Sequence, residues 1–357
     1  MIWHAIAETG AGVQRMAGAD LPDVIRSGTI LCEIDTARLL PDGGPLLHAG
    51  RRGPQPFLLS LGYSEDGRLR VVHRKGAQVL ALSVGIGGML AAGILRVSYH
   101  WDAGAGTATL TAEDPGRGAI LQSAGVAPPP LDADDALALA GSVGAGTVRS
   151  VAIGSGRHPI GAGACFGGDT PVMTPDGPVA ARLVRAGDRV VTDAGPRDVL
   201  WSGHMTVPGV GSFRPIRLCT PYFGATADLF VPPHARVALG GPEVEYLFDT
   251  EEVLVEARHL AADRTAVTEA DGAGLVTWHG LLLEEPRLIH ADGAWIESVY
   301  VGRLAASPDV ARTTALGGLA AEGRLPVHRR PVRRELCDFE AATLVLNMSQ
   351  RRSPVAA

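Results

Sequence analysis

The chain of 357 residues is long enough for two or three domains, and its 46% hydrophobic and 20% charged residues are typical of globular protein. The formal net charge of −6 excludes the strongly basic surface of nucleic-acid-binding proteins, so no nucleic-acid partner is expected. The four cysteines form no CxxC pair, and scattered histidines show no ligand spacing. We therefore expect no metal site, no other cofactor and no disulfide framework.

The N-terminal part of the chain predicts an all-β sandwich. The first eight residues lack the basic and apolar regions of a signal peptide, which leaves cytoplasmic residence and leaderless export equally open. Between residues 28 and 120, short apolar runs alternate with turn signals such as Glu65-Asp66-Gly67, a spacing typical of sandwiches. The candidate strands are Thr29–Asp35, Phe57–Gly62, Arg68–Arg74, Ile94–Trp101 and Thr107–Glu113.

One uncharged stretch, Val79–Leu95, is as long as the shortest membrane helices. It contains four glycines among β-branched residues, however, and glycine interrupts helices. We therefore predict two buried strands around the Gly87-Gly88 turn and no membrane span.

Part of this region, Arg68–Glu113, resembles concanavalin-like and laminin-G-like sandwiches, above all in the run from Leu95 to Asp102. The resemblance implies a jelly-roll-like fold and a glycan or cell-surface ligand as the candidate partner. No cluster of Asp and Asn marks a calcium or sugar site, so a sandwich without a ligand is the alternative.

Further along the chain, we expect one or two helical turns over Leu131–Ala140 and a strand over Val148–Ile153. The composition of Gly154–Gly163 is typical of a linker. The predicted division is a sandwich over 1–156, a linker over 157–164, a second β domain over 165–302 and a tail over 303–357. A helix is expected in this tail around Arg334–Leu346.

The second domain opens on the most informative motif, Ala164-Cys165-Phe166-Gly167-Gly168-Asp169-Thr170-Pro171-Val172-Met173-Thr174-Pro175-Asp176-Gly177. A cysteine follows a Gly/Ala linker, and a strand and an Asp-Gly turn come after it. Leu183 to Thr192 then predicts another strand, and Leu229-Phe230-Val231-Pro232-Pro233-His234 forms a later apolar block.

These blocks resemble, in order, those of the bacterial branch of the Hint (Hedgehog/intein) family. The resemblance covers about 140 residues, from Cys165 to about Gly302, and implies a Hint-type β fold after the sandwich. In that family the thiol attacks the preceding carbonyl, which is Ala164 here, and converts the peptide bond into a thioester. The resemblance makes Cys165 the nucleophile and His234 the proton-handling histidine, a role that suits a side chain titrating near neutral pH.

Other polar residues of the blocks are weaker candidates. Thr170 lies in the opening block, and His279 and Asp188 lie in later ones. For the histidines His279, His204 and His259, a structural role is the leading interpretation. Asp188 and Glu297 are interpreted as turn or surface residues, and an orienting role for them is the alternative. Cys219 has no supporting context and is expected in the core.

The chain departs from the family pattern at two places that bear on activity. Val231 stands where the family has Thr or Ser three residues before the histidine, so a hydroxyl that could orient the scissile amide is missing. No His-Asn pair followed by Cys, Ser or Thr closes the domain, so splicing with ligation is not expected.

Two functions follow from this sequence. The first is cleavage of the Ala164–Cys165 bond by an N-to-S acyl shift, with water or an external nucleophile resolving the thioester. The alternative is a glycan- or surface-binding module that carries a catalytically inert Hint scaffold.

Overall fold

The computed structural model describes residues 2–16, 21–144, 146–161, 165–261, 265–269 and 274–352. The chain forms two compact units, Met1–Gly161 with Val210–Ser212, and Ala162–Gly209 with Phe213–Ala357. Antiparallel sheets dominate both units, which confirms the predicted all-β fold. Among the described residues, no helix has the length and apolar character needed to cross a membrane.

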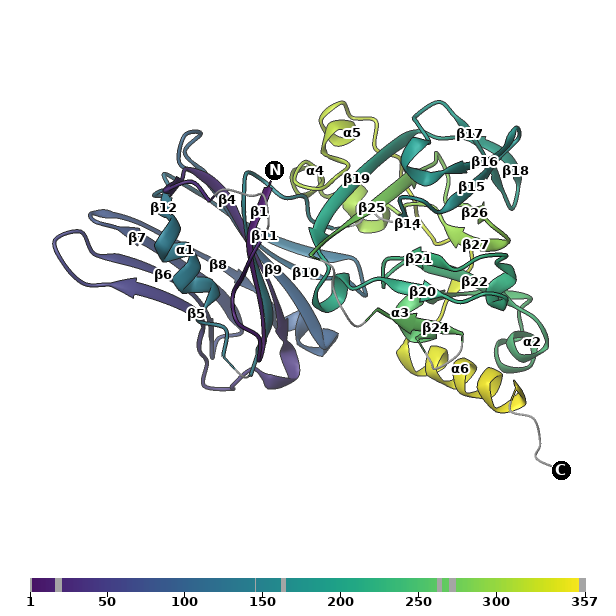
Figure 1. The fold of residues 1–357 in the computed structure, drawn as a ribbon, viewed down its shortest axis with the longest axis horizontal. Coiled ribbons are helices and arrows are strands. Elements are labelled where there is room, and N and C mark those ends of the chain that lie inside the picture. Colours follow the sequence, from purple (N-terminus) through teal and green to yellow (C-terminus); the bar gives the residue numbers. More distant parts are fainter. Residues whose placement is uncertain are drawn as a thin grey trace. The chain divides into compact units, whose positions relative to one another are not determined.

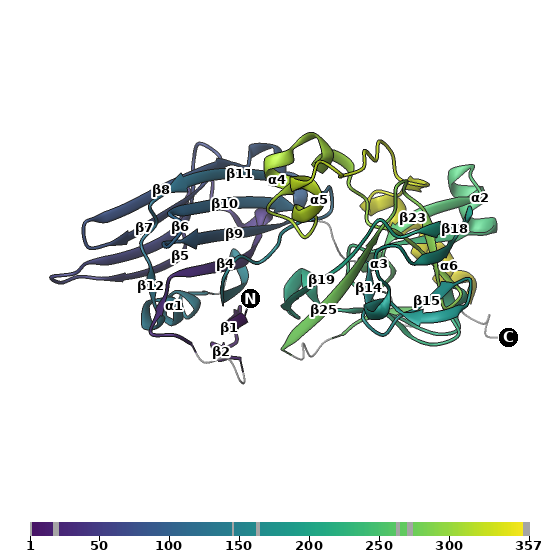
Figure 2. The same cartoon turned by 90° about the horizontal axis from the view of Figure 1, so that it is seen from above.

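The N-terminal unit is a sandwich of two antiparallel sheets (Figures 1 and 2). The larger sheet has the order β11 (Ala119–Val126), β10 (Thr107–Asp114), β9 (Ile94–Asp102), β4 (Ser27–Asp35), β13 (Val148–Ser155), β1 (Ile2–Glu8) and β2 (Gln14–Arg15). The smaller sheet has the order β5 (Gly44–Arg51), β6 (Phe57–Ser64), β7 (Arg68–Lys75) and β8 (Gln78–Gly85). The predicted strands are all present. Strands β1, β5 and β11 were not predicted. β1 pairs with β13 in antiparallel orientation.

The core of the sandwich lies between the inner faces of these sheets. Alternate residues such as Leu69 and Val71 of β7 face Val97 and Tyr99 of β9 within one buried cluster, as the two-residue period of strands requires. Helix α1 (Ala133–Ala140) contributes Leu139 to the same cluster. A short pair, β12 (Leu131–Asp132) with β3 (Val24–Ile25), lies beside it, and the 3₁₀ turns are η1 (Thr36–Arg38) and η2 (Gly87–Ala92).

A close backbone approach explains one glycine of this core. A Cβ atom at Gly28 would lie 2.6 Å from the ring of Trp101, which is fully buried. The indole Nε1–H of Trp101 donates to the carbonyl oxygen of Ile25 at 3.1 Å, so the buried polar group of this ring is satisfied. The segment Val79–Leu95 contains β8, the turn η2 and the start of β9, in agreement with two strands around Gly87-Gly88.

The second unit contains three sheets (Figure 1). The largest has the path β16 (Gly177–Ala180), β15 (Pro171–Thr174), β26 (Leu288–Ala291), β27 (Ala294–Glu297), β22 (Arg236–Gly240), β23 (Glu252–Glu256) and β28 (Arg334–Glu335), and β17 (Arg189–Thr192) joins it by pairing with β26 and with β18 (Gly195–Asp198). The other two are β14 (Phe166–Gly167), β25 (Leu275–Leu282) and β19 (Trp201–Pro208), and β21 (Leu229–Val231), β20 (Ile216–Leu218) and β24 (Ala266–Thr268).

Helices of this unit are short except at the C-terminus. They are α2 (Pro242–Phe248), α3 (Ala257–Leu260), α4 (Pro308–Ala311), α5 (Gly317–Ala321) and α6 (Asp338–Arg352), with 3₁₀ turns η3 (Ala181–Leu183), η5 (Tyr222–Gly224) and η6 (Gly302–Ala306). The expected helix around Arg334–Leu346 begins four residues later than predicted. Arg334 and Glu335 instead form β28, which pairs in parallel with Val253 and Leu254 of β23.

Candidate functional site

The thiol of Cys165 is buried at the start of the second unit, immediately before β14. Only 4% of the residue is exposed. Its backbone N–H donates to the carbonyl oxygen of His279 at 2.8 Å, which extends the pairing of Phe166 with His279 in β25. The amide nitrogen of the Ala164–Cys165 bond is therefore held in a fixed place. Ala164 itself, the predicted cleavage residue, lies outside the described residues.

Burial also determines the ionisation of this thiol. It raises the pKa of Cys165 to about 12, against an opposing hydrogen bond from the backbone N–H of Leu281. The negative charge of Glu297 raises this pKa further, and the positive charge of Arg236 lowers it. At neutral pH the group is a thiol, and proton removal must accompany any attack.

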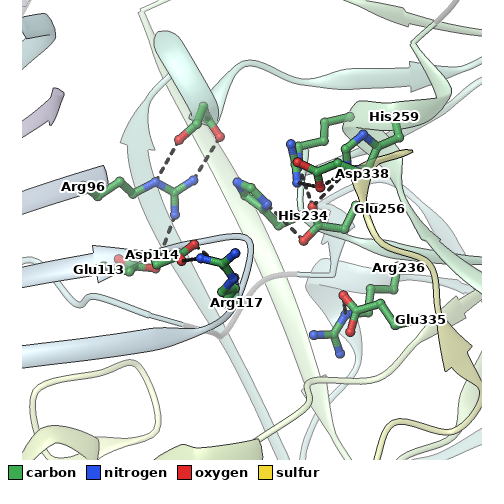
Figure 3. Close-up of polar contacts among 12 residues, drawn as sticks. Arg96, Glu113, Asp114, Arg117, His234, Arg236, Glu256, His259, Glu335 and Asp338 are labelled. Atoms are coloured by element: carbon green, nitrogen blue, oxygen red, sulfur yellow. Dashed lines mark hydrogen bonds and ion pairs between the residues drawn. The ribbon is translucent and has the colours of Figure 1, made fainter. Parts of the chain in front are cut away.

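The imidazole of His234 lies in the turn between β21 and β22, where the N–H of Ala235 donates to the carbonyl oxygen of Pro232 at 2.9 Å. Its Nδ1 lies 3.2 Å from Oε1 of Glu256 (Figure 3). Its Nε2 is buried and has no hydrogen-bond partner among the described residues. One ring nitrogen is thus held by a carboxylate while the other is free for a transferred proton.

The carboxylate of Glu256 is the centre of a charged cluster (Figure 3). Besides His234, it contacts Arg258 through Nε at 2.5 Å, and Arg258 also reaches Asp338 at the start of α6 at 3.0 Å. His259 Nε2 lies 3.2 Å from the same Asp338 carboxylate. Burial alone would raise the pKa of Glu256, but the hydrogen bond and charge of His234 and the charge of Arg258 lower it to about 2. Glu256 is therefore anionic across the physiological range.

A second ion group lies beside the first, around Arg236 of β22. Its Nη1 donates to Glu297 Oε2 at 2.7 Å and its Nε to Glu335 Oε1 at 3.0 Å. The backbone N–H of Val332 donates to the other oxygen of Glu297 at 3.0 Å. Since Arg236 and Glu297 both act on the Cys165 thiol, this pair belongs to the electrostatic surroundings of that thiol.

The segments that carry Cys165 and His234 are neighbours in the fold. A Cβ atom at Gly167 of β14 would lie 2.8 Å from the carbonyl oxygen of Phe230 in β21, and β21 leads directly to His234. The buried hydroxyl of Thr170 donates to the same Phe230 oxygen at 3.4 Å. The side chain of Thr170 therefore connects the opening block to the backbone of the histidine block.

The remaining predicted positions lie in less reactive settings. His279 contributes its backbone oxygen to Cys165, and its ring lies 5.6 Å from that of His204 between centroids. Burial lowers the pKa of His279, helped by the nearby His204. Asp188 is exposed and accepts a turn hydrogen bond from the N–H of Arg185 at 2.7 Å. Val231 is fully buried in β21 opposite Ile216, so its side chain serves the core.

Three residues of the site do not stand out in the sequence: Glu256, Arg236 and Glu335. One signal is available: Arg236 opens an apolar strand two residues after His234. Their partners come from β23, β27 and β28, which no sequence spacing connects to them. Among the described residues, no group of three or more His, Cys, Asp or Glu side chains is arranged to hold a metal ion.

Comparison with known proteins finds a family model that matches part of the second unit. Residues 164–303 match the family model described as Hint domain, which confirms the resemblance seen in the sequence. No curated protein matches the chain.

Several solved structures match the chain at low similarity. The AceL NrdHF class 3 split intein, a splice-inactive variant, is 10% identical over 38% of this chain and 98% of its own, with a TM-score of 0.27. The CBM40 of Ruminococcus gnavus IT-sialidase bound to α2,6-sialyllactose is 16% identical over 37% of this chain and 77% of its own, with a TM-score of 0.21. The LG1-3 region of the laminin alpha2 chain is 9% identical over 84% and 56%, with a TM-score of 0.26.

Proposed function

Because residues 164–303 form a Hint domain, a member of a family of self-processing folds, we propose that this chain cleaves its own Ala164–Cys165 peptide bond. The sulfur of Cys165 attacks the carbonyl carbon of Ala164, the C–N bond breaks, and the thiol proton ends on the departing nitrogen. Water or an external nucleophile then breaks the C–S bond of the thioester. This restores the thiol and releases the N-terminal sandwich.

The observation that carries the proposal is the position of Cys165 against strand β25. Its nitrogen is bonded to the carbonyl oxygen of His279 in this strand at 2.8 Å, and its thiol is buried. Such anchoring replaces an encounter by fixed geometry, which is a large part of what an intramolecular acyl transfer needs.

His234 supports the proposal as the group that handles the proton. Its free Nε2 is buried, and it comes from the segment next to that of Cys165. A histidine with one nitrogen bonded and the other free is suited to take a proton and return it within one reaction.

Two features of the site predict slow cleavage. With a pKa of about 12, roughly one thiol in 10⁵ is ionised at pH 7. In addition, the buried Val231 offers no hydroxyl to the scissile amide. The chain has no His-Asn pair followed by Cys, Ser or Thr, so the proposed reaction ends in cleavage and not in ligation.

The test is a time course of intact mass on the purified chain, with and without dithiothreitol. We expect one fragment that ends at Ala164 and one that begins at Cys165, with release faster in the presence of thiol. Cys165→Ala should stay whole, while Cys337→Ala, which removes an exposed thiol, should cleave like the parent chain. A single intact mass under all conditions overturns the proposal.

A second candidate function is binding of an acidic glycan by the sandwich, and the outer face of its smaller sheet favours it. Leu69, Val71 and His73 of β7 are buried, so Arg68 and Arg74 point to the opposite face. Arg70 shares this face and is paired with Asp66 at 2.6 Å. No Asp or Glu occurs within strands β5, β6, β7 or β8. The carboxylates or sulfates of an acidic glycan would complement this charge.

The Cys165→Ala chain can test this binding, because it stays whole under the first proposal. We expect retention on immobilised sialylated or sulfated glycans that falls with added salt and is lost in Arg68→Ser/Arg74→Ser. Arg303→Ser/Arg324→Ser, which removes two arginines of the second unit, is the matched control for net charge. Equal retention of both variants would remove the arginine face as the binding surface.

A further inference from the structure

We infer that Glu256 is a positioning residue of this site: its carboxylate keeps a proton on Nδ1 of His234 and thereby leaves Nε2 as the atom that handles the proton in cleavage. The orientation of His234 is inferred from the contacts of Glu256. Its role in catalysis rests on the proposed cleavage. Sequence comparison with the Hint pattern did not single out Glu256.

The contacts divide the two oxygens of Glu256 between two partners. Oε1 faces His234 Nδ1 at 3.2 Å and Oε2 faces Arg258 Nε at 2.5 Å. Only 5% of the Glu256 side chain is exposed. A buried carboxylate that is fixed at one oxygen by a guanidinium presents the other in a defined direction, which is what orienting an imidazole requires.

The charge of Glu256 decides which tautomer His234 adopts. The hydrogen bond from His234 and the hydrogen bond and charge of Arg258 lower the pKa of this carboxyl although burial opposes them, so it is ionised at neutral pH. An ionised carboxylate only accepts hydrogen bonds, so Nδ1 must carry the proton. The neutral ring then has its lone pair on Nε2, the buried nitrogen that has no partner among the described residues.

Groups on three further elements face this pair and keep it in place. Arg258 and His259 of α3 both reach Asp338 of α6, at 3.0 Å and 3.2 Å, and His259 lies 3.8 Å from Glu256 Oε2. Arg236 of β22 stands opposite Glu256 in the strand register. The positive charges of Arg258 and Arg236 favour the ionised state of Glu256.

The proton balance of the acyl shift gives the pair its role. Nε2 accepts the proton as the C–S bond forms, and it returns the same proton to the nitrogen as the C–N bond breaks. During the interval the ring is a cation, and the Glu256 carboxylate next to Nδ1 stabilises it. With a neutral amide at position 256, the ring could carry its proton on Nε2 and present no base.

The first test reads the tautomer directly and does not depend on cleavage. In the Cys165→Ala chain, ¹⁵N resonances of the His234 ring, assigned by their loss in His234→Gln, should report a protonated Nδ1 and an unprotonated Nε2. Adding Glu256→Gln should move protonation toward Nε2, whereas adding Glu322→Gln, at an exposed carboxylate outside the site, should not. A ring protonated at Nε2 in the Cys165→Ala chain would overturn the inference.

The second test measures rates with hydroxylamine present to resolve the thioester. Glu256→Gln should slow cleavage by about 10- to 100-fold, and Glu256→Asp should restore part of the rate. Glu322→Gln, a matched change at an exposed carboxylate outside the site, should remain within about twofold of the parent chain. An equal rate for Glu256→Gln and the parent overturns the role of Glu256. If the parent chain does not cleave, the proposed function fails, and the tautomer measurement still decides whether Glu256 orients His234.

Discussion

At the residue scale, the chemistry of this protein depends on how single ionisable groups are buried. Cys165 and Glu256 are equally buried, with 4% of each residue exposed, yet their pKa values shift in opposite directions. Burial dominates at Cys165 and raises its pKa to about 12, whereas His234 and Arg258 overcome burial at Glu256 and lower its pKa to about 2. The difference lies in the charge of the nearest partners.

The raised pKa of Cys165 predicts a pH dependence of cleavage. Because the thiol is neutral below its folded pKa, the thiolate fraction grows about tenfold for each pH unit between 7 and 10. In His234→Gln, which lacks the proposed proton acceptor, the rate of fragment formation with saturating hydroxylamine should increase in the same proportion. In the parent chain the increase should be shallower, because His234 takes the proton within the site. The measurement is intact mass at four pH values, with circular dichroism to verify the fold. A rate independent of pH in His234→Gln would mean that proton removal from Cys165 does not limit the acyl shift.

Buried histidines of the sandwich predict a second pH effect, on stability. Burial lowers the pKa of His73, His100 and His158 from 6.5 to about 4. The unfolded chain therefore binds more protons than the folded chain between these values. The stability they contribute is present above pH 6.5 and is lost as pH falls toward 4, by roughly 1.4 kcal/mol per pH unit for each histidine.

Urea unfolding of the sandwich across this pH range checks the effect. His73→Gln should make the dependence shallower, since His73 is fully buried and bonded only through Nδ1 to Tyr99 Oη at 2.9 Å among the described residues. A free energy of unfolding that stays constant between pH 6.5 and 4 would contradict the lowered pKa values.

At the scale of elements, the second unit depends on strands and a helix that come from its C-terminal segment. β28 adds a parallel strand to β23, the strand that ends at Glu256, and α6 supplies Asp338 to the charged cluster. The buried side chains of Leu336, Ala341 and Leu344 belong to the same segment. Residues after 303 thus complete the sheet that carries the candidate site.

This arrangement predicts that α6 stabilises the second unit through its buried face. Leu344→Ala should lower the free energy of unfolding by about 2–5 kcal/mol, because it removes a fully buried side chain. Leu346→Ala is the matched control: the side chain is 59% exposed, and we expect a change below about 0.5 kcal/mol. Equal effects in urea unfolding would indicate that α6 is not packed as described.

At the scale of the whole molecule, the two units have separate cores. Within the part of the chain that the structure describes, the cluster between the two sheets of the sandwich consists of buried residues between Ala7 and Ile153. The candidate site draws on β14, β21, β22, β23, β25 and β27 of the other unit. Cleavage at Ala164–Cys165 would therefore cut between two bodies that each retain their own core.

We predict two unfolding transitions in calorimetry of the Cys165→Ala chain. Leu69→Ala in the sandwich should lower the temperature of one transition, and Val253→Ala in β23 should lower the other, because each removes a fully buried side chain. A single transition that moves with both substitutions would mean that the units unfold together.

The amino-acid sequence by itself determined the class of the fold, the strands with clear apolar runs, and the Hint blocks with Cys165 and His234. Those features are local, since turn residues, strand periods and short motifs are read within ten or twenty residues. Only the tertiary structure decided that Glu256 orients toward His234, that Arg236 pairs with Glu297, and that β28 extends β23. The two members of each of these pairs lie 22 to 81 residues apart in sequence. No local sequence pattern indicates which side chain or strand meets which over such a separation.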